Sequence, residues 1–136
     1  GQRKARAFSL LKGPIMTKRF DFINTNTMYA CAQGSTFQAG VYVKDKYQTP
    51  TDLTGYTFRM QVRATADSPT VLLEITTSNY GTITASTGKL YWSVPANITA
   101  AVAAGMYYYD LELVSGGGVV KRILEGKFQV SAEVTR

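Results

Sequence analysis

The sequence predicts an all-β protein: an immunoglobulin-like antiparallel β-sandwich of seven or eight strands, with one short helix and an extended basic N-terminal arm. The clearest observation is residues 52–63, where turn residues lead into strict alternation of apolar and polar side chains. A period of two is typical of a strand with one buried and one solvated face, as in antiparallel sheets. Similar short runs recur about every 10 residues, which favours a sandwich, with an eight-stranded barrel as the alternative.

Charge divides the chain into two parts. Residues 1–19 hold six of its 15 basic residues and none of its 9 acidic ones, so residues 20–136 are neutral overall. We therefore interpret 1–19 as a basic arm and 20–136 as one sandwich domain. Helical spacing within the arm stops at Gly13-Pro14. Met16 is a candidate start of the natural product, in which case residues 1–15 would lie upstream of it.

The strands follow one another between turn signals. In residues 56–63 the apolar positions are Tyr56, Phe58, Met60 and Val62, and the polar ones are Thr57, Arg59, Gln61 and Arg63. The single helix is expected at 95–104, because proline suits a first helical turn and Gly105 a helix end. Further strands are expected at 20–23, 37–44, 71–76, around 83, 90–94, 107–113, 119–125 and 128–130, with a hairpin turn at 115–118 and a bulge or bend at Gly126.

The residue inventory argues against an enzyme. The chain has no histidine, which excludes Cys-His and Ser-His-Asp catalysis and histidine metal ligation together. The single cysteine, Cys31, cannot form an internal disulfide and is expected to be a small buried hydrophobe. Trp92 alternates with apolar neighbours and is expected in the core. We expect no catalytic residue, no metal and no cofactor.

Three features of the sequence are candidates for a functional site: a pair of carboxylates, a run of glycines and an outward tyrosine. Asp110 and Glu112 point to one face of their strand, and we interpret them as a solvated face answered by Lys121 or Arg122 across the hairpin. Glycines 116–118 are followed by a strand, so they predict a hairpin and not a phosphate loop. Tyr108 lies opposite the apolar face of its strand and suits a subunit interface. The possible interface residues are Tyr108, Arg59 and Arg63.

Several short motifs carry a family resemblance across residues 20–134. They are Phe20-Asp21-Phe22, Gln33-Gly34-Ser35-Thr36-Phe37, Thr49-Pro50-Thr51-Asp52-Leu53-Thr54-Gly55-Tyr56, Gly105-Met106-Tyr107-Tyr108-Tyr109-Asp110-Leu111 and Leu124-Glu125-Gly126. In this order they resemble the small β-sandwich proteins of tailed bacteriophages, in particular the N-terminal domains of baseplate upper proteins. The chain departs from that pattern at Ser35, where an aspartate is common, and at Thr51, where an apolar residue is common.

The resemblance implies a non-enzymatic structural protein of the virion, in the tail, baseplate or neck, made in the cytoplasm of the bacterial host. Its partners would be other virion proteins and further copies of itself; no membrane is expected, and no nucleic acid except through the arm. Alternatives are a capsid decoration or cement protein and a host-receptor or carbohydrate-binding module. The arm would dock on a neighbour through its basic and apolar residues, which are Arg3, Lys4, Arg6, Phe8, Leu10, Leu11 and Lys12.

Overall fold

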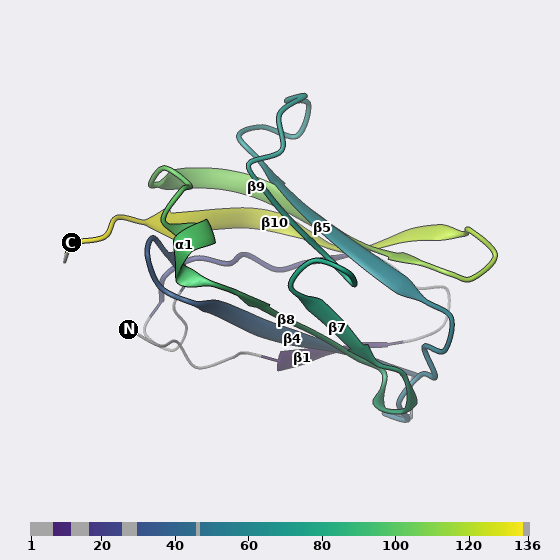
Figure 1. Cartoon of the computed structure of the whole chain (residues 1–136). Helices are drawn as coiled ribbons and strands as arrows, with labels where there is room; N and C mark the ends of the chain where they lie inside the picture. The colour runs from purple at the N-terminus through teal and green to yellow at the C-terminus, as the bar shows by residue number, and fades with distance from the viewer. Residues whose placement is uncertain (1–6, 12–16, 26–29, 46, 135–136) are drawn as a thin grey trace.

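Two β-sheets packed face to face form the protein in the computed structural model, which describes residues 7–11, 17–25, 30–45 and 47–134 (Figure 1). The predicted all-β sandwich is confirmed. The alternative, an eight-stranded barrel, is excluded, because the strands form two separate sheets. The alternation that predicted the sandwich also explains it. The longer strands turn their apolar side chains inward, so two half-apolar sheets cover one another.

The smaller sheet has four strands in the order β1-β4-β8-β7. These are β1 (Ala7–Leu11), β4 (Phe37–Lys44), β8 (Lys89–Val94) and β7 (Gly81–Thr84). Strand β8 is antiparallel to both β4 and β7, whereas β1 runs parallel to β4.

The larger sheet has six strands, with β2-β10-β9-β5-β6 in order and β3 paired with β10. Their bounds are β2 (Lys18–Arg19), β3 (Cys31–Ala32), β5 (Thr57–Arg63), β6 (Leu73–Thr76), β9 (Gly105–Val114) and β10 (Val120–Ser131). Strands β2 and β3 are parallel to β10. The predicted antiparallel pairing holds among β4 to β10, whereas the N-terminal strands β1, β2 and β3 pair in parallel with their neighbours.

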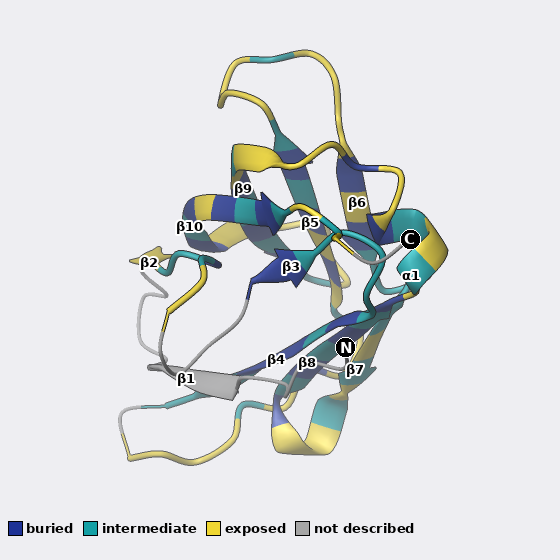
Figure 2. Cartoon of the chain, turned by 90° about the vertical axis from the view of Figure 1, so that its left-hand side faces the viewer, coloured by how far each residue is buried: buried dark blue, intermediate teal, exposed yellow. Residues whose placement is uncertain are grey.

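The core between the sheets is aromatic. Phe22 lies at its centre, with ring centroids 5.7 Å from Phe37, 6.2 Å from Trp92 and 5.0 Å from Tyr109, mostly edge to face. Such pairs add stability beyond the area that they bury. Trp92 is fully buried, as predicted. Figure 2 shows the buried residues along the surfaces by which the two sheets face each other.

The helix is shorter than the sequence predicts. Instead of residues 95–104, only α1 (Ala96–Thr99) is helical, with Pro95 as its N-cap; a 3-10 turn, η1 (Ala85–Thr87), precedes β8. The Thr99 hydroxyl ends the helix by donating to the Ser35 carbonyl at 2.8 Å and accepting from the Gly34 amide at 3.1 Å. These tertiary bonds hold the chain where local propensity would have continued the helix.

Residues 17–25 lie along β10. The Phe20 amide donates to the Glu125 carbonyl at 3.0 Å, and the Phe22 amide to the Lys127 carbonyl at 2.9 Å. The strand predicted at 20–23 is reduced to a single bridge between Phe22 and Phe128. The predicted irregularity in the last strand is also displaced, because the register shift lies between Arg122 and Leu124 and not at Gly126.

Candidate interaction surface

The outer face of the six-stranded sheet gathers most of the charged side chains that the strands carry. Alternation in β5, β9 and β10 turns these residues outward while their neighbours fill the core. We call this surface the charged face. It comprises Arg59, Gln61, Arg63, Glu74, Tyr108, Asp110, Glu112, Arg122, Glu125 and Lys127.

A row of acidic residues crosses the middle of the charged face. In register, Glu74 on β6 lies beside Gln61 on β5, Gln61 beside Asp110 on β9, and Asp110 beside Glu125 on β10. The Gln61 amide donates to Glu74 at 2.6 Å. Among the described residues Glu74 forms no salt bridge, so its charge is not neutralised by a neighbour. We call Glu74, Asp110 and Glu125 the acidic row.

Arginines flank the acidic row on one side. Arg59 and Glu112 pair across β5 and β9 with 2.7 Å between Nε and Oε1. Arg122 lies 3.3 Å from Asp110 and 3.3 Å from Glu125. Across the hairpin, Arg122 pairs with Asp110 as predicted, but Glu112 is paired by Arg59 of β5 instead, and Lys121 forms no salt bridge with any described residue.

Tyr108 and Arg63 form the other side of the charged face. They are direct partners between β9 and β5, and Tyr108 is 42% exposed. The Arg63 guanidinium donates to the Ser68 carbonyl at 2.6 Å and to the Gln61 amide oxygen at 2.8 Å. Of the three possible interface residues named from the sequence, all lie on this face: Tyr108, Arg59 and Arg63. Their role in an interface stays a prediction.

A loop projects from the sheet at the edge of the charged face. Residues 64–72 connect β5 to β6 and project away from the sheet in Figure 1. Arg63 fixes the base of this loop through its bond to Ser68. A hollow of about 380 Å³ lies over the sheet beside the loop, lined by Ala66 of the loop and by residues of the sheet that include Arg19, Arg63, Tyr108, Asp110 and Glu125. A partner side chain could enter it between an aromatic ring and charged groups of both signs.

The electrostatics of the acidic row can be read from Asp110. Burial raises the pKa of this carboxyl above its ordinary value, and the nearby charges of Glu112 and Glu125 raise it further, while Arg122 opposes the shift. Arg63 also opposes the shift, so burial and the neighbouring carboxylates outweigh the two arginines in setting the pKa of Asp110.

A second surface, on the opposite side of the molecule, was not singled out by the sequence. Tyr42 and Lys44 of β4 and Lys89 and Tyr91 of β8 turn outward and are half-buried; we call them the tyrosine–lysine face. The Lys89 ammonium lies 5.6 Å from the Tyr42 ring centroid and 5.3 Å from that of Tyr91, and Lys44 lies 5.5 Å from Tyr42. Alternation could place Tyr42 and Lys44 outward, but nothing local pairs β4 with β8.

The structure describes only some of the predicted arm residues. Arg3, Lys4, Arg6 and Lys12 lie outside the described residues. The backbone of Phe8, Leu10 and Leu11 belongs to β1, where they are partners of Val41, Val43 and Lys44 of β4 in the same chain. Docking of the arm on a neighbour stays a prediction.

Within the described residues no three histidine, cysteine, aspartate or glutamate side chains come together as a metal site. Cys31 is buried, as expected, and burial raises its pKa to about 12. Over the same residues, no helix has the length and apolar character required to cross a membrane.

Comparisons with known proteins give structural matches only. No family model matches the chain, and no curated protein sequence does. Among solved structures it is similar to the N-terminal domain of phage TP901-1 ORF48, with 12% identity, a TM-score of 0.43 and coverage of 97% of this chain and 96% of that one. It is also similar to CopC from Methylosinus trichosporium OB3b, with 14% identity, a TM-score of 0.35 and coverage of 58% and 66%.

The first match bears on the resemblance stated from the sequence. The sequence motifs resemble small β-sandwich proteins of tailed phages, and a phage domain of almost the same extent is among the similar structures. Both TM-scores are too low to carry an argument about function, which must therefore come from the surface itself.

Proposed function

We propose that this chain is a non-enzymatic structural protein of a tailed-phage virion, a component of the tail, baseplate or neck that packs in symmetric copies. The motifs across residues 20–134 support the class of protein, and the charged face supports the mode of action. The single observation that carries the proposal is the juxtaposition of Tyr108 and Arg63 beside the projecting loop 64–72. Tyrosine and arginine are the residues that most often anchor protein interfaces.

The N-terminal arm adds a second contact in this proposal. Arg3, Lys4, Arg6 and Lys12 would meet carboxylates of a neighbouring subunit, and Phe8, Leu10 and Leu11 would add apolar contact. Ordering such a segment costs about 1–2 kcal/mol per residue in backbone entropy, so the contact has to be extensive.

Mass spectrometry of purified virions tests the class. Particles from the natural source should contain peptides of this chain in a fixed ratio to other virion proteins, and virions free of it would contradict the proposal. The arm is tested on the full chain, by neutralising it with Arg3→Ala, Lys4→Ala and Arg6→Ala together. This variant should fold as before but enter particles less efficiently, and incorporation equal to wild type would exclude the arm as a docking element.

Capsid decoration is the closest alternative, because a cement protein would use the same surfaces on a different partner. Location within the particle separates the two: labelled antibody should mark the tail or its attachment site in the first case and the whole capsid in the second. Binding to a host receptor or carbohydrate is the second alternative, and half-buried Tyr42 and Tyr91 are the aromatic residues that would favour it.

A further inference from the structure

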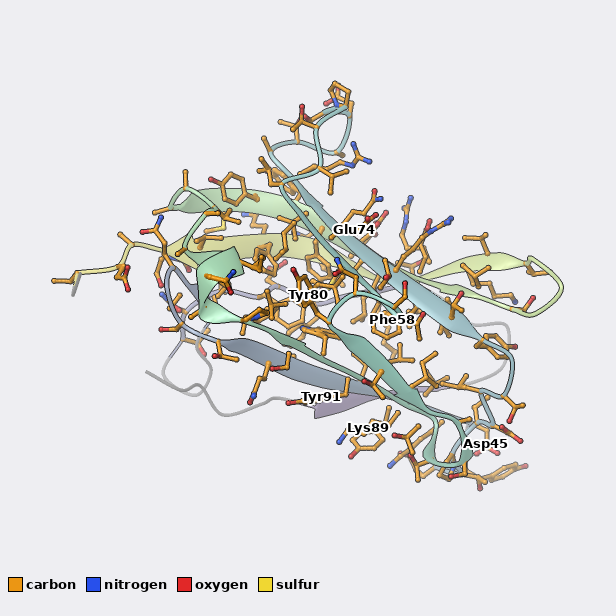
Figure 3. The ribbon with its side chains drawn as sticks, in the orientation of Figure 1. Asp45, Phe58, Glu74, Tyr80, Lys89 and Tyr91 are labelled. Carbon is orange, nitrogen blue, oxygen red and sulfur yellow. The ribbon has the colours of Figure 1, made fainter. Side chains whose placement is uncertain are left out.

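The outer face of the smaller sheet carries positive charge and no carboxylate. Its four strands contain no acidic residue. All 9 acidic residues of the chain lie in the part that the structure describes, either on the strands of the larger sheet or outside the strands. In Figure 3, Lys89 and Tyr91 lie on the lower side of the molecule, away from Glu74 on the upper side. The tyrosine–lysine face is therefore basic, although residues 20–136 are neutral overall.

The two lysines of this face have no counter-charge from their own chain. Among the described residues, neither Lys44 nor Lys89 forms a salt bridge with any of these carboxylates. The carboxylate nearest in sequence, that of Asp45, accepts from the Tyr47 and Thr49 amides, both at 2.9 Å, and so serves its own loop. Both ammonium groups are thus available to an anion from outside.

Lys89 is held in place between two tyrosine rings. Its ammonium lies 5.6 Å from the Tyr42 ring centroid and 5.3 Å from that of Tyr91. Its side chain passes close to buried Gly40, where a Cβ would lie 3.5 Å from the Lys89 Cε. Cation–π contacts of this kind fix an ammonium before a partner arrives, which lowers the entropy cost of binding.

The spacing of Lys44 and Lys89 matches an extended polypeptide. Lys89 on β8 is the register partner of Tyr42, and Lys44 lies two residues further along β4 on the same side of the strand. Such diagonal neighbours in an antiparallel pair lie about 7–8 Å apart. Side chains at alternate positions of an extended segment are separated by about 7 Å. An extended segment with a carboxylate at every second residue could therefore meet both lysines at once.

We propose that the tyrosine–lysine face binds an extended acidic segment of another virion protein, whose carboxylates at alternate positions pair with Lys44 and Lys89. This inference rests on the proposed virion function and names the chemistry of one partner. A second copy of the chain is a poor partner for this face. Of the four carboxylates on its strands, three already pair with arginines, namely Asp110, Glu112 and Glu125.

The make-up of the face favours carboxylates over other anions and over sugars. Sugars and nucleic-acid bases stack on open aromatic faces, whereas here Lys89 lies over the Tyr42 and Tyr91 rings. Phosphate groups are matched best by the two-pronged guanidinium of arginine, and the strands of the smaller sheet contain no arginine. A carboxylate needs only a point charge held in position, which Lys89 supplies.

Binding of two synthetic peptides to the full chain tests the inference. One alternates glutamate with threonine. The other carries the same number of glutamates at every third position, so that carboxylates on one side of the extended peptide lie about 20 Å apart. The basic arm attracts both equally, so a difference in affinity reports the face. The alternating peptide should bind about two- to fivefold more tightly, the gain from one further exposed ion pair. Equal affinities would overturn the proposal.

Amide chemical shifts of the 14.9 kDa chain locate the contact. The alternating peptide should shift the amides of Tyr42, Lys44, Lys89 and Tyr91, and Lys89→Gln should abolish the preference for it. Lys121→Gln is the matched control, because it removes an exposed lysine of the larger sheet and should keep the preference. Unfolding of both variants at wild-type denaturant concentrations confirms their fold. Shifts confined to other surfaces, or a preference that survives Lys89→Gln, would exclude this contact.

Two further probes test the class of partner. At equal charge, a single-stranded oligonucleotide should shift the Lys44 and Lys89 amides less than the alternating peptide does, and a neutral glucose oligomer should not shift them. Larger shifts with either probe would overturn the choice of a polypeptide. Failure of peptide binding would leave the proposed virion function standing, because mass spectrometry of particles tests that function independently.

Discussion

The Tyr109 hydroxyl, on β9, donates a hydrogen bond to the backbone carbonyl of Phe20, 89 positions earlier in the chain. It is one of several contacts that fasten the segment from Lys18 to Ile23 onto the large sheet. The Asp21 carboxylate accepts from the Lys127 amide at 2.9 Å, and the Thr17 hydroxyl donates to the Arg122 carbonyl at 2.8 Å. From residue 17 onward, the N-terminal segment is therefore packed onto the large sheet as part of the sandwich.

Removing the Tyr109 hydroxyl should therefore destabilise the whole domain. In Tyr109→Phe the Phe20 carbonyl loses its side-chain donor in a partly buried place, which we expect to lower the free energy of unfolding by about 1–3 kcal/mol. Urea unfolding followed by Trp92 fluorescence measures it. Tyr107→Phe is the matched control, because Tyr107 bonds the Ala103 carbonyl at an exposed position and its loss should cost less than about 0.5 kcal/mol. Equal effects of the two changes would show that the contact with Phe20 has no special weight.

Gly126 allows the same segment to approach β10 closely. A Cβ at Gly126 would lie 2.3 Å from the Phe20 carbonyl oxygen and 2.7 Å from the Asp21 carboxylate. Gly126→Ala should force the segment outward and cost about 1–3 kcal/mol, measured by thermal or urea unfolding. Gly117→Ala, in the hairpin turn, meets no atom nearer than 3.9 Å and should change stability by less than about 0.5 kcal/mol. Two equally stable variants would contradict this packing.

Asp110 predicts a pH dependence of stability with a defined sign. Its folded pKa is raised, first by burial and then by Glu112 and Glu125, so ionisation is harder in the folded state than in the unfolded one. The resulting penalty is absent below the unfolded pKa and is fully present once the pH exceeds the folded pKa. When the pH rises from acid to neutral, the free energy of unfolding should therefore fall less, or rise more, in Asp110→Asn than in wild type. Parallel pH–stability curves for the two proteins would refute it.

Cys31 should be inert in the folded protein. Burial raises its pKa to about 12, so almost no thiolate is present at neutral pH, and the side chain is fully buried. Reaction with an aromatic disulfide reagent should be negligible in buffer and complete in denaturant. Rapid modification under native conditions would mean that the pairing of β3 with β10 opens readily.

Local alternation explains which parts of the structure were foreseeable. Phe58, Met60 and Val62 are buried as the pattern of β5 predicts, and the turn at 115–118 joins β9 to β10. The same pattern placed Arg59 and Arg63 on the face where they are found. The pattern could not predict the order in which the strands lie side by side in each sheet. The parallel pairing of β2 and β3 with β10 joins residues more than 90 positions apart, and no local signal encodes it.

The candidate surfaces show the same division. Asp110 and Glu112 were foreseen as an outward face, because they lie two apart on one strand. The acidic row was not, because Glu74 and Asp110 become neighbours only through Gln61 on the strand between them. Tyr42 and Lys89 likewise meet only through the register of β4 and β8.

The pairing of β2 and β3 with β10 has a consequence for biosynthesis. A ribosome makes the N-terminal strands early, but their hydrogen-bonding partner, β10, is among the last parts of the chain to be made. The Asp21 carboxylate, for example, accepts a hydrogen bond from the Lys127 amide, 106 positions later in the sequence. The sandwich cannot close during translation, and a chain truncated before β10 would leave Phe20 and Phe22 uncovered. Unfinished chains of this protein should therefore be recognised by chaperones and proteases, whereas finished ones escape both.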